Sequence, residues 1–314
     1  MLLNPVLAAS MVLAQLLQLF VLPVWLLPQD SRWGWLLLPM VALTLPTWAL
    51  VHDCFHGSFS ARPKVNGRVG RVLAVGFGAP YHLLRTGHLL HHKHNRGPRD
   101  RSEVYDDRRG SWLGMAPSYY FRLLGGLYFY ELLAVPLVCL PRPWVAAAIR
   151  RAAAKDNVVE QMGAVLMRPQ VLREMRQDAL AVMLLLAASA WCYGAHAWML
   201  VLALAGRGLV ISLHDNSYHY DTALDGPHEA LTLRLPAMLM PLVLNFNLHE
   251  THHRHPQIGW RGLPDAHRRD GGRFDIAFGT ALLRQLRGPL PLSRVQALTS
   301  QTSPDLHEQQ GVAP

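Results

Sequence analysis

Residues 6–27 read VLAASMVLAQLLQLFVLPVWLL, an apolar stretch without a charged side chain. As an α-helix rising about 1.5 Å per residue, this stretch covers the roughly 30 Å of a bilayer's hydrocarbon core. Residues 35–51 (WLLLPMVALTLPTWALV) repeat the pattern after the short polar turn PQDSRWG. The two stretches therefore predict a transmembrane hairpin.

The composition agrees with a membrane protein. Hydrophobic residues make up 51% of the 314 and charged residues 16%, whereas soluble domains carry about a quarter charged residues. The net charge is +9, but only Arg32 among the basic residues precedes residue 60. Basic residues that flank apolar segments on one side of the chain are typical of a cytoplasmic membrane face, so we expect no nucleic-acid partner. The N-terminal stretch lacks the features of a cleaved signal peptide and is expected to remain as an anchor.

A second hairpin is predicted at 179–194 and 197–213, with a break at YGAH. Residues 123–140 are less clear, because Glu131, a Gly-Gly pair and a proline interrupt them, and a lone crossing would place the basic stretch 142–176 outside. We expect an interfacial or re-entrant segment there.

The expected fold class is an all-α integral membrane protein with four transmembrane helices in two hairpins and a cytoplasmic helical cap. One domain would cover 1–285, with the cap at 52–178 and 214–285, and 286–314 would form a flexible tail. The histidine-rich segments all fall in the cap or at its border, near the cytoplasmic ends of the spans.

Histidine is the outlying residue type, with 17 copies. Three boxes hold eight of them: HDCFH at 52–56, HLLHH at 88–92 and HETHH at 249–253. Spacings of i, i+3 and i+4 place side chains on one helical face, and the topology brings the boxes to one side of the membrane. His94 and His255 fall off these faces.

Imidazole suits iron, zinc, copper and nickel. A tetrahedral zinc site needs only three or four ligands, so eight or nine histidines favour two metal ions, with redox-active iron as the natural candidate. Metal-bound imidazoles commonly hydrogen-bond to nearby carboxylates. The acidic residues placed to act in this way are Asp53, Asp100, Asp215, Asp221 and Glu250.

The three boxes, together with NFNLHETHHRHPQIGWRGLP at 245–264, resemble the membrane fatty acid desaturase/hydroxylase superfamily over about residues 46–265. The resemblance implies two Fe ions that activate O2 to attack an unactivated C–H bond. The ligands it implies are His52, His56, His88, His91, His92, His249, His252 and His253. It also implies one further histidine after the fourth span: His219 in NSYHYD, with His214 as the competitor that spacing does not exclude.

The resemblance further implies the reaction and its partners. We expect desaturation of a fatty acyl or similar lipid chain, with a hydroxylase or carotenoid ketolase as the alternative in the same superfamily. No fused cytochrome b5-like domain is recognised, so electrons are expected from a separate ferredoxin-, rubredoxin- or cytochrome b5-type donor. A bacterial inner membrane with a cytoplasmic active site is the expected location.

Two other classes of function use the same residues. HETHH also satisfies HExxH, the zinc-protease motif, with His249 and His253 as ligands and Glu250 as general base; this reading leaves the other two boxes unexplained. A metal transporter would need ionisable residues near the middle of its spans, whereas the histidines lie at the ends of theirs.

Overall fold

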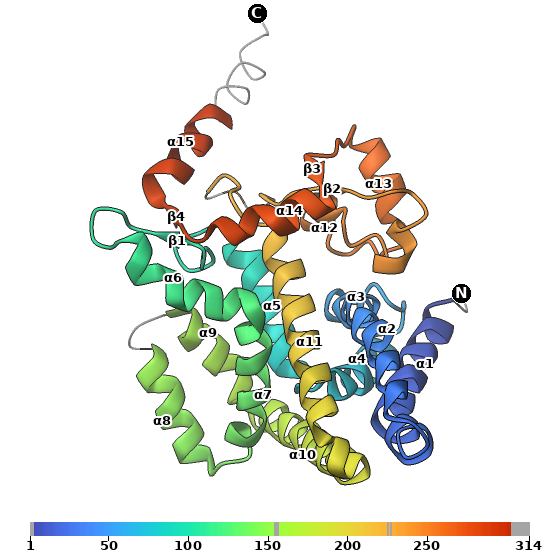
Figure 1. The fold of residues 1–314 in the computed structure, drawn as a ribbon. Helices are drawn as coiled ribbons and strands as arrows, with labels where there is room; N and C mark the ends of the chain where they lie inside the picture. The colour runs from blue at the N-terminus through green and yellow to red at the C-terminus, as the bar shows by residue number, and fades with distance from the viewer. Residues whose placement is uncertain (1–2, 154–156, 225, 227, 303–314) are drawn as a thin grey trace, which may run out of the picture.

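The computed structural model describes residues 3–153, 157–224, 226 and 228–302, and most of them are helical (Figure 1). In this part of the chain, four helical segments are long and apolar enough to cross a membrane. They are Leu3–Leu26, Ser31–His56, Trp112–Val138 and Pro169–Ser217. The first two cover the predicted spans 6–27 and 35–51, and the fourth covers both 179–194 and 197–213. The third, Trp112–Val138, corresponds to no predicted span.

The first two segments cover the two spans predicted for the N-terminal hairpin. α1 (Leu3–Leu16) continues into the π-helical η1 (Leu17–Leu26), and after a turn η2 (Ser31–Leu36), α2 (Leu37–Ala42) and α3 (Thr44–His56) return. Pro23 lies within η1, where the wider π-helical turn accommodates a residue without a backbone N–H. α3 ends at Gly57, whose φ of 77° is readily adopted only by glycine.

The segment Pro169–Ser217 covers both predicted spans 179–194 and 197–213 and begins earlier than 179. α10 (Pro169–Tyr193), η4 (Gly194–His196) and α11 (Ala197–Ser217) form a continuous run, and α10 packs against α11. Hydropathy places the start of this span at residue 179, because the first helical turns of α10, residues 169–178, are mostly polar. Those turns are nevertheless helical and pack on α4 (Pro63–Phe77), where Arg71 lies 2.7 Å from the Asp178 carboxylate.

Residues 112–138 include most of the stretch 123–140, for which an interfacial or re-entrant placement is expected. α6 (Trp112–Phe121), η3 (Arg122–Gly126) and α7 (Leu127–Val138) form one helical segment with a kink, and η3 and α7 pack against α11. Gly125 has φ 115°, and a Cβ added at Gly208 would lie 3.3 Å from the Gly125 carbonyl oxygen. The glycines that weaken the hydropathy signal therefore let two helices pack backbone against backbone.

The remaining helices surround the spans or lie across one end of them (Figure 1). Near the spans are α5 (Tyr81–His94), α8 (Arg142–Ala153) and α9 (Asn157–Leu166). The C-terminal part contains η5 (Met240–Val243), α12 (His249–Arg254), α13 (Leu263–Arg269), α14 (Phe278–Arg284), η6 (Gln285–Arg287) and α15 (Leu292–Thr302). β1 (Val104–Tyr105) pairs in parallel with β4 (Leu290–Pro291), and β2 (Leu233–Arg234) pairs in parallel with β3 (Ile276–Ala277).

Part of the predicted flexible tail is structured. β4 and α15 follow residue 286, and Val295 is fully buried in a cluster with Tyr220 and Leu224. Hydropathy gave no sign of this helix because only a few of its side chains are apolar. Residues 303–314 of the predicted tail lie outside the described residues.

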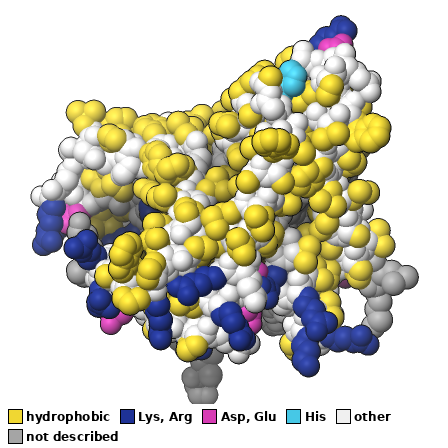
Figure 2. Space-filling view, turned by 90° about the horizontal axis from the view of Figure 1, so that it is seen from below, with side chains coloured by type: hydrophobic (Ala, Val, Ile, Leu, Met, Phe, Trp, Pro, Cys, Tyr) yellow, Lys and Arg dark blue, Asp and Glu magenta, His cyan; other side chains and the backbone are white. Residues whose placement is uncertain are grey.

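Exposed tryptophans mark the end of the spans opposite the histidine boxes. Trp25, Trp35, Trp191 and Trp198 are 68%, 73%, 87% and 56% exposed. They flank the turns at 27–36 and 193–197, which one hydrophobic cluster joins through Leu27, Tyr193 and neighbouring residues. Seen from below, the surface is largely hydrophobic, and Lys and Arg gather along its lower and left edges (Figure 2). Exposed tryptophans of this kind are typical of a membrane–water interface.

Candidate metal centre

Nine histidines from four segments converge in two groups. α3 and α5 contribute the first two boxes, the turn after α11 contributes one histidine, and α12 contributes the third box. In each group the candidate ligand nitrogens all lie within 4.8 Å of one another. The first group is His52, His56, His88, His92 and His252, and the second is His91, His219, His249 and His253. These are the nine residues that the sequence singled out.

In the first group, ring nitrogens from different helices face one another. The Nε2 atoms of His56 and His88 lie 2.8 Å apart, and those of His92 and His252 lie 3.0 Å apart. The ring of His52 lies 4.2 Å from that of His252, centroid to centroid. Residues separated by up to 200 positions in the chain therefore share one small volume.

The second group adjoins the first. His249 Nε2 lies 3.2 Å from His253 Nε2, and the rings of His91 and His219 are 4.7 Å apart. The rings of His92 and His253, one from each group, stack at 4.2 Å with an interplanar angle of 19°. The two groups are therefore neighbours, in contact through this stacked pair of imidazoles.

The boxes do not each serve one group, as a shared helical face would suggest. In HLLHH, His88 and His92 join the first group and His91 joins the second. In HETHH the division is reversed: His249 and His253 join the second group and His252 joins the first. On a helix, positions i and i+4 differ by about 40° around the axis, whereas i+3 and i+4 differ by about 100°. The i, i+4 pair therefore stays together, and the third histidine points to the neighbouring group.

The structure distinguishes His219 from His214, which the sequence left open. His219 belongs to the second group, and its Nδ1 lies 3.2 Å from the Glu229 carbonyl oxygen, leaving Nε2 directed elsewhere. His214 is buried, and its ring nitrogens lie 3.2 and 3.4 Å from the Tyr218 hydroxyl. His214 belongs to neither group.

The donor set fits metal ions. Within the described part of the chain, His52 Nε2 and His219 Nε2 are buried without a hydrogen-bond partner. A buried polar atom without a partner destabilises the folded state. Coordination of a metal ion by the lone pair of the imidazole nitrogen removes that penalty. Imidazole nitrogen is a ligand for iron, zinc, copper and nickel.

Electrostatics favours neutral rings with free lone pairs. Burial lowers the pKa of His92 to about 2. Burial, together with neighbouring imidazoles, also lowers the pKa values of His88, His249, His252 and His253 well below the usual range. Neutral imidazole is the form that binds metals.

His91 is the exception, because a carboxylate touches it. Burial alone would lower the pKa of His91, but the charge and hydrogen bond of Asp100 outweigh burial and raise it. His91 Nδ1 lies 2.8 Å from Asp100 Oδ2, so the ring donates from Nδ1 and keeps Nε2 for the group. Asp100 thus occupies the position expected of a carboxylate partner.

The other four acidic residues suggested as partners form no hydrogen bond to a histidine of the two groups within the described residues. Asp53 accepts from the Trp260 backbone N–H, and Asp221 pairs with Arg284 and Arg294. Among the described residues, Asp215 has no hydrogen bond to a histidine, although its negative charge helps to raise the pKa of His91. Sequence spacing could not assign these partners, since each depends on how distant segments pack.

Glu250 is turned away from the histidines of HExxH. Its carboxylate lies 2.5 Å from the Arg254 guanidinium and 3.4 Å from the Thr232 hydroxyl. His252, which the protease motif leaves without a role, belongs to the first histidine group. The geometry therefore argues against Glu250 as a general base acting between His249 and His253.

A buried ion pair that the sequence did not reveal fixes the loop carrying Asp100. Arg96 is fully buried, lies 2.5 Å from Glu103, and donates to the carbonyl oxygens of Thr222 and Ala223. It ties the segment after α5 to the turn after His219. No local pattern marks Arg96 among the basic residues around it, because the carbonyl oxygens of Thr222 and Ala223 that fix its guanidinium lie more than 120 positions away in the chain.

A cavity of about 440 Å³ adjoins both groups. His88 of the first group and His91 and His219 of the second line it. Apolar side chains from α3, α5, α7, α9 and α11 form much of the remaining wall, including Trp48, Leu84, Leu127, Met162 and Ile211. Polar and charged side chains form the rest of the wall, among them Arg99, Asp100, Arg122, Glu131 and Asp215. A cavity that combines apolar walls with polar groups is typical of a small-molecule site.

The chain is similar to known desaturases. The family model for "Fatty acid desaturase" matches residues 31–276. The chain is 36% identical over 116 residues to the "sn-2 acyl-lipid omega-3 desaturase (ferredoxin), chloroplastic" of Arabidopsis thaliana, which covers 35% of this chain and 24% of that relative. It is also 36% identical over 70 residues to the "Delta(12) fatty acid desaturase" of Mortierella alpina, covering 22% of this chain and 17% of that relative.

These matches span about a quarter or less of the relatives' own length. No solved structure matches the chain significantly. The family model, however, covers most of the chain, including all nine histidines of the two groups. The chain therefore belongs to the fatty acid desaturase family.

Proposed function

We propose that this protein is an O2-dependent membrane oxidase that desaturates a fatty acyl or similar lipid chain. The observation that carries the proposal is the convergence of nine imidazoles, in groups of five and four, beside a largely apolar cavity. Family membership and the names of the relatives support the same reaction. In balanced form, a CH2–CH2 unit, O2, two electrons and two protons give CH=CH and two water molecules.

Two Fe ions are the metals we assign to the groups. His52, His56, His88, His92 and His252 would hold one ion, and His91, His219, His249 and His253 the other. Iron at these positions would supply the redox chemistry that reduces dioxygen.

The chain's own groups orient the ligands and shape the cavity. Asp100 fixes the ring of His91, and the Glu229 carbonyl fixes that of His219. Arg96 and Glu103 hold the Asp100 loop. The apolar wall excludes bulk water from the reacting chain and aligns it along α5 and α11, so that the position of the chain selects the carbons that are oxidised.

We further propose two membrane hairpins with the histidine groups on the cytoplasmic side, in a bacterial inner membrane. The exposed tryptophans at the opposite turns and the scarcity of basic residues before position 60 support this orientation. Electrons would come from a separate ferredoxin-, rubredoxin- or cytochrome b5-type protein. The Arabidopsis relative has ferredoxin in its name.

The test combines metal analysis with product analysis. The purified protein should contain about two iron atoms per chain, in line with two ligand groups, and with a reductant system it should remove two hydrogens from an acyl substrate, as mass spectrometry would show. Gain of one oxygen atom would instead favour the hydroxylase, and gain of oxygen with loss of two hydrogens the ketolase. Zinc without iron would rule out the proposal and revive the protease alternative.

A further inference from the structure

Three polar atoms in the wall of the large cavity have no partner. Trp48 Nε1 on α3, Glu131 Oε2 on α7 and Ser212 Oγ on α11 are buried and form no hydrogen bond within the described residues. All three residues line the cavity that adjoins the histidine groups. Trp48 is 8% exposed and Ser212 2% exposed, so bulk solvent does not satisfy them.

Two residues of the cavity wall lie one helical turn from proposed metal ligands on the same helix. Trp48 precedes His52 by four residues on α3, and Leu84, in the same wall, precedes His88 by four residues on α5. Four residues correspond to about 6 Å along a helix. Trp48 therefore lies about one helical turn before His52, and Glu131 and Ser212 line the same cavity from α7 and α11.

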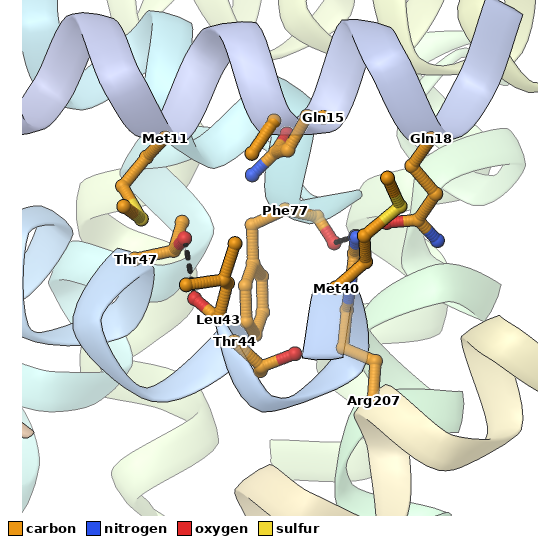
Figure 3. Close-up of a pocket in the computed structure, with 10 residues that line it drawn as sticks. Met11, Gln15, Gln18, Met40, Leu43, Thr44, Thr47, Phe77 and Arg207 are labelled. Atoms are coloured by element: carbon orange, nitrogen blue, oxygen red, sulfur yellow. Dashed lines mark hydrogen bonds between the residues drawn. The ribbon is translucent and has the colours of Figure 1, made fainter. Parts of the chain in front are cut away.

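A second, much smaller cavity also contains an unpartnered polar atom and serves as a comparison. Thr44 Oγ1 is also buried without a partner, and its cavity lies between α1, α3 and α11, near Gln15, Gln18 and Arg207 (Figure 3). That cavity measures about 10 Å³, enough for about one water molecule. A single water accounts for Thr44, but the cavity of about 440 Å³ has room for a substrate chain as well.

The chemistry of the three atoms defines the ligand they fit. The Trp48 indole N–H only donates, so the ligand must offer an acceptor. Glu131 and Asp215 line the same cavity, and neither forms an ion pair within the described part of the chain. The same wall carries the Arg96–Glu103 ion pair, Asp100, Arg99 and Arg122, so its net charge does not select the ligand. The unpartnered oxygen of Glu131 does, because an ionised carboxylate accepts a hydrogen bond and calls for a donor on the ligand. A hydroxyl group accepts from Trp48, donates to Glu131 and can do either with Ser212.

We propose that this wall binds a hydroxyl group of the substrate, so that the preferred substrate is a hydroxylated acyl chain. The inference rests on the proposed function and narrows its substrate class. The substrate's hydroxyl would lie a short distance from the carbons beside the histidine groups. Its hydrogen bonds would stop the acyl chain from sliding along the cavity. A cavity built to hydrogen-bond a hydroxyl discriminates strongly against an analogue without one, because its polar groups are then left unpaired.

The experiment compares matched chains. The iron-loaded protein in phospholipid nanodiscs, with a reductant system, is given phosphatidylcholine carrying octadecanoyl chains or monohydroxy-octadecanoyl chains with the hydroxyl at successive carbons. At least one hydroxy isomer should show a kcat/KM about tenfold or more above that of the plain chain. Trp48→Phe, Ser212→Ala and Glu131→Leu should each reduce that ratio, and Glu131→Gln should retain more of it.

Thr44→Val is the matched control, since it removes a buried, unpartnered hydroxyl from the other cavity and should leave the ratio unchanged. A binding measurement avoids dependence on turnover. In the metal-free protein, the preferred hydroxy chain should raise Tm more than the plain chain does, and Ser212→Ala with Glu131→Leu should remove the difference.

Equal turnover of plain and hydroxylated chains by the iron-loaded protein would overturn the inference and leave the desaturase proposal standing. If the variants of Trp48, Glu131 and Ser212 lost kcat/KM equally for plain and hydroxylated chains, the inference would also be overturned. The three polar atoms would then be bound to water and not to the substrate. Absence of iron and of turnover, with no preference in Tm, would reject both proposals. Absence of turnover with the Tm preference retained would reject only the proposed reaction.

Discussion

The Nδ1 atom of His91 lies 2.8 Å from a carboxylate oxygen of Asp100. It is the one contact between a histidine of the two groups and an acidic side chain within 4.0 Å among the described residues. It fixes the tautomer and the orientation of the only histidine that α5 contributes to the second group.

Asp100→Asn should weaken metal binding in the second group. The amide keeps the size of the side chain but loses the charge, and such partners typically contribute about 10- to 100-fold in metal affinity. Iron retained after timed exposure to a chelator measures the effect. Asp270→Asn is the matched control, because Asp270 pairs with His255 at 2.9 Å outside both groups. Equal retention by both variants would contradict the role of Asp100.

His219→Ala and His214→Gln should differ sharply. His219 is one of four candidate ligands in its group, whereas His214 contacts Tyr218 and Phe246 and joins neither group. Iron per chain should fall toward about half in His219→Ala, since one four-ligand site is opened, and should stay near the wild-type value in His214→Gln. The reverse pattern would move the ligand to His214.

The metal-free protein should lose stability as pH falls. The ordinary pKa of histidine is 6.5, and that of His92 in the folded protein is about 2. Between these values the unfolded chain binds the additional proton, so the free energy of unfolding decreases as pH drops below about 6.5. Thermal unfolding of chelator-treated protein at a series of pH values measures the slope. His92→Asn should make the slope shallower, and a flat wild-type profile would contradict the assignment of neutral rings.

Gly125→Ala should destabilise the packing of η3 on α11. A non-glycine residue at φ 115° is strained by about 1–3 kcal/mol, and the neighbouring contact with Gly208 leaves little room for adjustment. Gly67→Ala on α4 is the control, since its Cβ would meet nothing within 4 Å and alanine favours a helix. The midpoint of thermal unfolding in detergent should fall only for Gly125→Ala.

The sequence predicts the members of the histidine groups well but not their division. Spacing places His88, His91 and His92 within one helical turn and identifies them as a set. Which of them faces which group depends on the approach of α3 and α12, which no local pattern records. His219 is distinguished from His214 for a similar reason, because the choice depends on how the turn after α11 packs against Glu229.

Hydropathy predicts the apolar spans, but it misses helical segments that are stabilised by contacts between distant parts of the chain. The start of α10 lies in polar residues that pack on Arg71, and the kinked helix at 112–138 contains a Gly-Gly pair that only the nearby α11 explains. Arg96 is likewise indistinguishable from its basic neighbours until its distant partners are known. Local periodicity therefore reveals the apolar helices, while charged and glycine-mediated contacts set their limits.

Adjacent residues of one helix, His91 and His92, face different histidine groups, and His252 and His253 do the same on α12. The two centres consequently cannot drift apart without unwinding a helix, because each is tethered to the other through a single peptide bond at two points. Their separation is set by the pitch of α5 and α12 rather than by loop conformation. A substrate that shifts either helix would move both centres together, as one rigid body.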